Sequence, residues 1–258
     1  MLERVFRNID DGFYIDVGAA HPVFRSVTMH FYQRGWQGVN VEPVLDYHLL
    51  LTKHRVRDIN LHLALGKNEG RFPFFEVEDC PELSTLCKDY GETYSERLDT
   101  VLQKEVNVTT LEKVCHEHAH KEIHFLKIDV EGAQLDVIEG GDWSTFRPSI
   151  VLIEATKPNT PDPDWSHWEP QLLSYGHNFV YFDGVNRFYV KEETMGLAKH
   201  FSVPPNVFDN FQIHSPEADM LVTSLKQELH KVQHSGSWQY TRPLRTLRRC
   251  FGALISKL

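Results

Sequence analysis

The chain has 258 residues, of which 41% are hydrophobic, 24% charged and 12% aromatic, the composition of an ordinary globular protein and not of a disordered or fibrous one. Its net charge of −9 provides no overall attraction to nucleic acid, so we expect no nucleic-acid partner. There is no apolar run of membrane-spanning length, and the first residues lack the basic-then-apolar order of a signal peptide, so we expect a cytoplasmic protein.

The first quarter of the chain alternates between strand-like and helix-like segments. Strands separated by helices pair in parallel, so this alternation predicts a doubly wound α/β sheet. Strands are expected at 13–17, 39–43 and 59–65, and helices at 26–34, with Ser26 as N-cap, and at 44–54.

Residues 66–108 are less regular, with an expected hairpin around 71–77 and a polar segment around 85–96. We expect substrate-covering loops there, because long insertions in α/β folds are commonly functional.

The alternation then resumes. The expected elements are a helix at 109–118 with Thr109 as N-cap, a strand at 123–129, a helix from Gly132 to 140, a strand at 148–154, a helix at 165–175 and a hairpin at 179–190.

The composition changes after about residue 215. Residues 217–234 have a helical pattern, 235–237 resemble a hinge, and 242–258 place basic residues beside an apolar stripe with no acid. We therefore expect a domain at 1–215 and a C-terminal helical extension at 216–258. Its tail fits peripheral binding at the inner membrane face, docking on an acidic partner, or packing on its own domain or on a second copy in a homo-oligomer.

Acidic residues stand at the carboxyl ends of the predicted strands. Asp16 and Glu42 end the first two strands, Glu154 ends the strand at 148–154, and Asp129 and Glu131 follow the apolar run that begins at residue 123. Open α/β sheets bind their ligands just beyond these strand ends, so the acids predict a site.

The turn after the first strand distinguishes between cofactors. Dinucleotide-binding folds need G-x-G-x-x-G, whereas residues 16–22 contain a single glycine, Gly18, and begin with an acid. An acid would repel a phosphate but suits the cationic S-adenosylmethionine, and Glu42 is placed to accept both ribose hydroxyls. The alternative is that Asp16 and Glu42 only cap helices; the presence of both favours the nucleoside site.

Four segments, 13–21, 35–43, 125–132 and 147–154, resemble the FkbM family of S-adenosylmethionine-dependent methyltransferases. The likeness extends over about residues 10–195. It implies a Rossmann-like class I methyltransferase fold with a mostly parallel seven-stranded sheet and an antiparallel edge hairpin, and O-methylation, often of a sugar hydroxyl. Gln134 and the His21-Pro22 turn depart from the residues that the family often has.

Carried over by position, this resemblance implies that Asp16, Gly18 and Glu42 bind the cofactor. Ala19 and Ala64 belong to the same expected set.

The resemblance also places Lys127, Asp129 and Glu131 at the reacting centre. A neutral sugar hydroxyl is a poor nucleophile, so its methylation needs a proton acceptor or a metal ion. Asp129 is the first candidate, either as a base paired with Lys127 or as a ligand of Mg²⁺ together with Glu154. Glu131 is either catalytic or a helix N-terminal charge, and His21 is a second candidate base.

Two other patterns are less informative. Residues 115–120 contain three histidines that would diverge around a helix, so we expect a solvated helix end and no metal site. In the hairpin, Asn186 and Arg187 beside Tyr181 and Tyr189 fit either sugar binding or an ordinary edge strand.

The leading hypothesis is therefore an enzyme that methylates a sugar hydroxyl of a bacterial surface polysaccharide, such as O-antigen, or of a glycolipid. Segment 237–245 is similar to a segment of bacterial proteins of surface-polysaccharide synthesis, which favours a glycan. The rivals are a non-catalytic assembly partner in a glycan-synthesis or glycosyltransferase complex, and a small-molecule O-methyltransferase. Acids at all the strand ends favour the enzyme.

Overall fold

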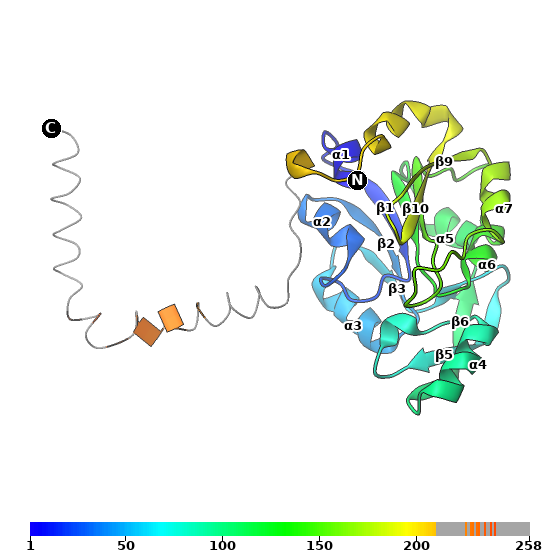
Figure 1. Cartoon of the computed structure of the whole chain (residues 1–258), viewed down its shortest axis with the longest axis horizontal. Helices are drawn as coiled ribbons and strands as arrows, with labels where there is room; N and C mark the ends of the chain where they lie inside the picture. The colour runs from blue at the N-terminus through cyan, green and yellow to red at the C-terminus, as the bar shows by residue number, and fades with distance from the viewer. Residues whose placement is uncertain are drawn as a thin grey trace. The chain divides into compact units, whose positions relative to one another are not determined.

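The computed structural model describes residues 1–209 and eight residues beyond them, at positions 225, 228, 229, 231, 232, 235, 238 and 240 (Figure 1). The chain divides into two units, residues 1–204 and 205–258. In the second unit a short 3-10 helix, η3, covers Val207–Asp209, and the five described residues of the helix expected at 217–234 are helical. The rest of that helix and the tail at 242–258 lie outside the described residues, so the C-terminal extension stays a prediction.

A seven-stranded sheet forms the centre of residues 1–204, in the order β3-β2-β1-β7-β8-β10-β9. Neighbouring strands from β3 to β8 run parallel, whereas β10 runs antiparallel to both of its neighbours. The mostly parallel seven-stranded sheet with an antiparallel edge hairpin is thereby confirmed, and the fold is Rossmann-like. The strands are β1 (Phe13–Val17), β2 (Gln37–Val41), β3 (Ile59–Leu61), β7 (Phe125–Ile128), β8 (Ile150–Glu154), β9 (His177–Phe182) and β10 (Asn186–Lys191).

The order of the strands reverses between β1 and β7. The chain moves outward from β1 to β3 and then returns to place β7 on the other side of β1. Val17 pairs with Ile128, and the N–H of Asp129 donates to the carbonyl of Val17 at 3.0 Å. The turns that follow β1 and β7 therefore leave the sheet side by side, at the switch point where open α/β sheets bind ligands.

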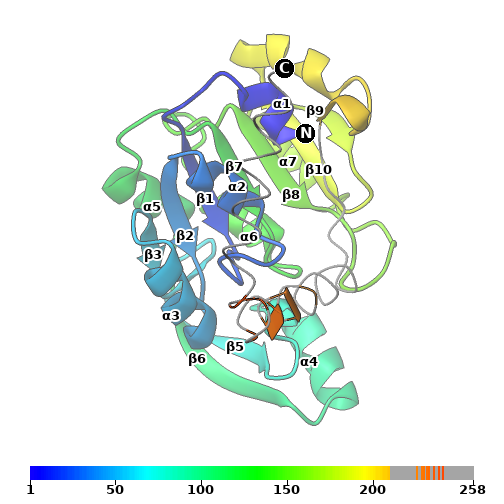
Figure 2. The same cartoon turned by 90° about the vertical axis from the view of Figure 1, so that its left-hand side faces the viewer.

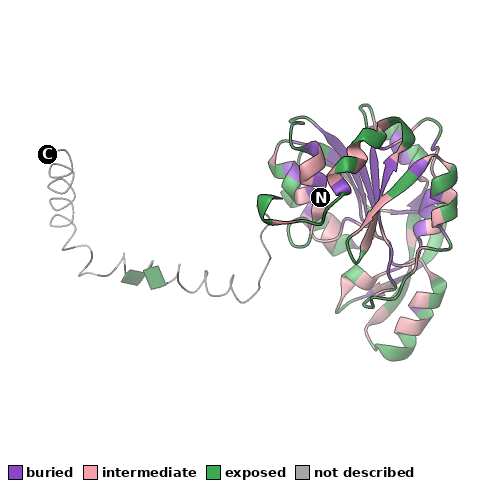
Figure 3. Cartoon of the chain, turned by 45° about the horizontal axis from the view of Figure 1, so that its top comes forward, coloured by how far each residue is buried: buried purple, intermediate pink, exposed green. Residues whose placement is uncertain are grey.

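Alternate residues of the central strands face two different apolar cores. Ile15, Leu126 and Val151 belong to one core, and Tyr14, Phe125 and Leu152 to the other. Both faces of the central strands are buried, as Figure 3 shows, which explains why their sequences are continuous apolar runs. Burial of each large apolar side chain contributes about 1.5–3 kcal/mol to stability.

Helices cover both faces of this sheet. The first core packs against α5 (Leu111–His118), α6 (Gln134–Glu139) and α7 (Glu169–Ser174), and the second against α1 (Leu2–Phe6), α2 (Val27–Gln33) and the 3-10 segment η2 (Glu192–Phe201). The helix α3 (Leu45–His54) connects β2 to β3. Side chains two positions apart along a strand face the same side of the sheet. The side chains of Asp16, Lys127 and Glu154 therefore lie on the same side as those of Tyr14, Phe125 and Leu152, which is the side covered by α2.

The insertion predicted to form covering loops is instead a second sheet with its own helix. Strands β4 (Ala64–Leu65), β6 (Val101–Thr109) and β5 (Gly70–Val77) lie in the order β4-β6-β5, with η1 (Pro81–Leu83) and α4 (Lys88–Arg97) between β5 and β6. Figures 1 and 2 show β5, β6 and α4 together at the opposite end of this unit from α1. Strand β6 was not predicted, because its first seven residues are largely exposed and polar residues interrupt its apolar pattern.

Four local predictions were wrong. The hairpin expected around 71–77 is a single strand, β5, which pairs with β6. The strand expected at 59–65 splits into β3 and β4, which belong to different sheets. The N-cap of α5 is Thr110 and not Thr109, because the Thr110 hydroxyl accepts the N–H of Lys113 at 3.2 Å. Ser26 does occupy the N-cap position of α2, but its side chain makes no capping hydrogen bond.

The described part of the chain has no helix that is both long enough and apolar enough to cross a lipid bilayer.

Candidate active site

One cavity lies at the carboxyl ends of β1, β2, β7 and β8, with a volume of about 240 Å³. Residues 20–26 and residues 81–86 of the insertion contribute further walls. The structure thus brings together all ten residues that the sequence analysis singled out for cofactor, catalysis or metal. They are Asp16, Gly18, Ala19, His21, Glu42, Ala64, Lys127, Asp129, Glu131 and Glu154.

Gly18 allows the turn after β1 to pass close to the turn after β7. Its φ is +73°, and a Cβ added there would lie 1.8 Å from the carbonyl oxygen of Asp129. The N–H groups of Gly18 and Ala19 both donate to the carbonyl of Val41, at 3.0 and 3.2 Å. A side chain at position 18 would therefore both strain the backbone and push the two strand ends apart.

Glu42 is a buried carboxylate that the backbone holds at both oxygens. Its Oε2 accepts the N–H of Ala20 at 2.7 Å, and its Oε1 accepts the N–H of Val44 at 2.8 Å. Burial raises the pKa of Glu42 to about 7, although these two N–H donors oppose the shift. The side chain lines the cavity, so its remaining lone pairs can accept hydroxyl groups of a ligand.

Lys127 links the ends of β1 and β7 and contacts the turn that follows β1. Its Nζ lies 3.2 Å from Asp16 Oδ1 and 3.2 Å from Asp129 Oδ2, and it donates to the carbonyl of Gly18 at 3.0 Å. Burial alone would lower the pKa of Lys127, but Asp129 and Asp16 together raise it above its ordinary value. The ammonium group therefore stays charged and positions the turn after β1 against Asp129.

Asp16 enters the cavity as a carboxylate that is already paired. It is 1% exposed, and its Oδ2 accepts the hydroxyl of Thr28 at 2.8 Å while Oδ1 faces Lys127. Its contacts thus favour a role in positioning the turn over a direct contact with a cationic ligand.

Behind Asp16 lies a buried arginine that the sequence did not single out. The guanidinium of Arg55 is fully buried and donates to Thr28 at 2.8 Å, to Asp58 at 3.0 Å and to the carbonyl of Pro22 at 3.0 Å. It thereby fixes both the partner of Asp16 and the loop that walls the cavity. Thr28 and Pro22 are distant from Arg55 in the sequence, so sequence spacing gives no signal for this role.

Asp129, Glu131 and Glu154 form a cluster of carboxylates on the cavity wall. One oxygen from each lies within 4.8 Å of the others. Asp129 is more accessible than Glu131: its side chain is 37% exposed, whereas the whole Glu131 residue is 8% exposed. Burial, followed by the charge of Asp129, raises the pKa of both Glu131 and Glu154 above their ordinary values.

Glu131 also has unusual backbone geometry. Its φ of +49° is a backbone conformation that residues other than glycine rarely adopt. The hydroxyl of Thr85 holds this conformation by donating to the Glu131 carbonyl at 2.6 Å. Helix α6 begins only at Gln134 and has six residues, so the structure does not favour the alternative of a helix N-terminal charge.

His21 caps its own turn. Its Nδ1 accepts the N–H groups of Val23 and Phe24, at 3.1 and 3.0 Å, which leaves the proton of the neutral ring on Nε2. Burial, followed by the nearby His54, lowers the pKa of His21 and favours this neutral form. A ring nitrogen that carries a proton is a donor, so these contacts favour a structural role over that of a base.

The hairpin residues considered for sugar binding already have partners within the fold: Asn186 donates to Asp183, and the ring of Tyr181 packs against that of Phe188. Arg187 donates to Glu169 at 2.6 Å and to the hydroxyl of Tyr189 at 3.0 Å, and it lies over the ring of Phe179. None of these residues lines the cavity. The arrangement fits the alternative of an ordinary edge hairpin.

The sheet order, the turn with one glycine and the buried acid that follows β2 define a methyltransferase-class α/β fold and not a dinucleotide-binding one. The chain belongs to the Methyltransferase FkbM domain family, which matches residues 16–179. Membership implies methyl transfer from S-adenosylmethionine.

Among solved structures, the chain is similar to the methyltransferase FkbM from Methylobacillus flagellatus KT, at 14% identity and a TM-score of 0.43. The match covers 70% of this chain and 44% of that one, so this chain corresponds to less than half of the solved protein. No curated protein matches the sequence.

Proposed function

We propose that this chain methylates a hydroxyl group of a sugar, with S-adenosylmethionine as the methyl donor and Asp129 as the proton acceptor. The main support for the proposal is the accessible Asp129 carboxylate, which Lys127 holds at the end of β7. It lies beside the turn at residues 16–22, which we call the cofactor turn. In the reaction the substrate oxygen forms the new C–O bond, the S–CH₃ bond breaks, and the hydroxyl proton passes to Asp129.

The cavity suits the cofactor as well as the reaction. Val44, Leu65 and Phe74 provide an apolar wall that fits an adenine ring, and Glu42 presents fixed oxygens that fit ribose hydroxyls. A Cβ at Gly18 would collide with the backbone of Asp129, so this glycine keeps the cofactor turn close to the proton acceptor. When bound, S-adenosylmethionine supplies an electrophilic methyl group.

The pKa of Glu42 predicts that cofactor affinity depends on pH. The carboxylate must be ionised to accept two hydroxyl protons, and its pKa is raised to about 7, so affinity should increase as the pH rises through 7. We expect binding about tenfold weaker at pH 6 than at pH 8, because about one tenth of the groups is ionised at pH 6. Calorimetric titrations with S-adenosylmethionine across this range measure the effect.

The Glu42→Gln variant provides the control, because it should bind weakly with little dependence on pH. Without ligand, the stability of the fold should depend on pH in the opposite direction to the affinity. A carboxyl group whose pKa is raised on folding stabilises the folded state below its unfolded pKa, and this stabilisation is lost as the pH rises toward 7. Equal slopes of affinity against pH in wild type and Glu42→Gln would show that Glu42 does not contact the ribose.

The proposed function is tested in two stages. Calorimetry with S-adenosylmethionine distinguishes the enzyme from a non-catalytic assembly partner, which would show no binding. Transfer of labelled methyl groups to a panel of oligosaccharides, glycolipids and small hydroxylated acceptors then identifies the substrate class. Methylation confined to small molecules or to nitrogen acceptors would overturn the sugar O-methylation proposal.

The expected Mg²⁺ ion is an alternative to direct base catalysis within this proposal, because a bound cation also promotes loss of the hydroxyl proton. Direct base catalysis by Asp129 predicts activity that is indifferent to a chelator, whereas an ion held with Glu154 predicts activity lost to the chelator and restored by Mg²⁺.

A further inference from the structure

We propose that Asp129, Glu131 and Glu154 together form a binding site for a hard divalent cation. The inference develops the second of the two alternatives above, in which Asp129 and Glu154 hold an ion, and it rests on the proposed function for the role of the ion but not for its binding. Glu131 is the residue that the structure adds to the pair expected from the sequence.

The spacing of the carboxylates suits such an ion. Their nearest oxygens all lie within 4.8 Å of one another. Oxygens on opposite sides of an ion are about 4.2 Å apart for Mg²⁺ and about 4.8 Å apart for Ca²⁺, given ligand distances of about 2.1 and 2.4 Å. The three carboxylates can therefore converge on one ion with small side-chain movements, and the cavity leaves room for water and a substrate oxygen to complete its shell.

Two oxygens of the cluster are buried without a partner. Glu131 Oε2 and Glu154 Oε2 accept no hydrogen bond, and the Glu131 side chain belongs to a residue that is more than nine-tenths buried. Within the described part of the chain, Lys127 pairs with Asp16 and Asp129 but forms no ion pair with either glutamate. A buried carboxylate oxygen without a partner is costly, so each of these oxygens requires a proton or a cation.

The surrounding backbone holds Glu131 in place for this role. The left-handed conformation of Glu131 is maintained by Thr85, and Gly132, with φ +95°, packs against the ring of Tyr90 from α4. Strain of this kind persists where the surroundings enforce it, and it often marks a functional site.

Tyr94 of α4 lies near the same cluster. Its hydroxyl is buried without a partner, and burial followed by the charges of Glu131 and Glu154 raises the pKa of Tyr94. The hydroxyl is thus available to donate to a ligand or water of the ion, and its ring provides an optical reporter of the site.

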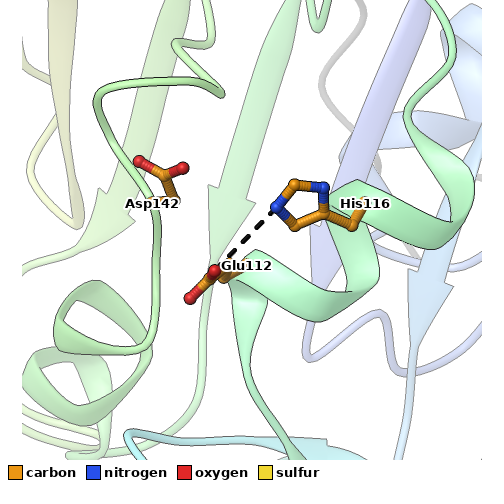
Figure 4. Close-up of side chains that lie close together, drawn as sticks. All are labelled: Glu112, His116 and Asp142. Carbon is orange, nitrogen blue, oxygen red and sulfur yellow. Dashed lines mark ion pairs between the residues drawn. The ribbon is translucent and has the colours of Figure 1, made fainter.

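A second group of metal-ligating residues offers a contrast. Glu112 and His116 of α5 lie near Asp142, as Figure 4 shows, but both α5 side chains are more than half exposed. Hydrogen bonds from Ser144 and Thr145 lower the pKa of Asp142 to about 2, so this carboxylate already has partners. This surface group provides a matched control.

The test is a titration of the full chain with Mn²⁺ alone, without cofactor or substrate, in which electron paramagnetic resonance counts the free ion. We expect one site in the wild type, affinity at least tenfold weaker in Glu131→Gln and Glu154→Gln, and no change in Glu112→Gln. Tb³⁺ luminescence excited through tyrosine gives a second readout, which Tyr94→Phe should reduce. Thermal unfolding and S-adenosylmethionine binding of each variant verify that it is folded.

Absence of Mn²⁺ binding to the wild type at millimolar concentration would overturn the site and indicate that the glutamates share protons instead. Binding lost in Glu112→Gln but retained in Glu131→Gln would equally overturn it and locate the ion at the surface group. Methyl transfer that persists in a chelator would then leave the proposed function standing, whereas failure to bind S-adenosylmethionine would remove that function without affecting the Mn²⁺ result.

Discussion

Replacing Asp129 by asparagine is expected to lower kcat about 10²- to 10⁴-fold, the usual contribution of a general base. The amide preserves the shape of the side chain but can neither accept the hydroxyl proton nor serve as an anionic ligand of a cation. Asp129 is accessible and lies beside the turn that follows β1, so the affinity for S-adenosylmethionine should change less than threefold. Single-turnover methyl transfer and calorimetry on the same preparation measure the two quantities.

The matched control is Asp11→Asn. Asp11 precedes β1, at the end of the strand opposite Asp16, and its exposed carboxylate pairs with Lys121 at 2.8 Å. It should leave both kcat and affinity unchanged. If Asp129→Asn retained more than one tenth of the wild-type kcat, the proton would have to leave by another route, and Asp129 would not be the acceptor.

The parts of the site that the sequence predicted correctly are those that local pattern determines. An apolar run of strand length followed by an acid placed Asp16, Glu42, Asp129 and Glu154 at strand ends, and parallel pairing then brought those ends to one edge of the sheet. The alternation of side chains along each strand even determines which face these acids share.

What the sequence missed depends on pairing between distant segments. Lys127 pairs with Asp129 as expected, but it also pairs with Asp16, its neighbour in register, and only the alignment of β1 with β7 reveals that second contact. The role of Arg55 likewise follows from partners 27 and 33 positions away, Thr28 and Pro22. Tyr94 lies near the carboxylates only because the insertion folds as a sheet with a helix. The sequence of the mostly exposed strand β6 gives no clear indication of that sheet.

The burial of Lys127 predicts the second large effect. Lys127→Met should lower the free energy of unfolding by about 3–5 kcal/mol, because it leaves the buried Asp16 carboxylate without its cation. The lysine side chain is 9% exposed and that of Asp16 1%, so water cannot replace the lost partner. Loss of the bond from Lys127 to the Gly18 carbonyl should also weaken S-adenosylmethionine binding. Urea unfolding followed by fluorescence measures the stability.

Two further variants separate the uncompensated charge from simple loss of packing. Asp16→Asn in the Lys127→Met background removes the orphaned charge while Thr28 retains its acceptor, so part of the lost stability should return. Lys121→Met breaks the exposed pair with Asp11 and should cost less than about 1 kcal/mol. If Lys127→Met were as mild as Lys121→Met, or if the double variant were no more stable than the single one, the pair of Lys127 with Asp16 would not be what holds the ends of β1 and β7 together.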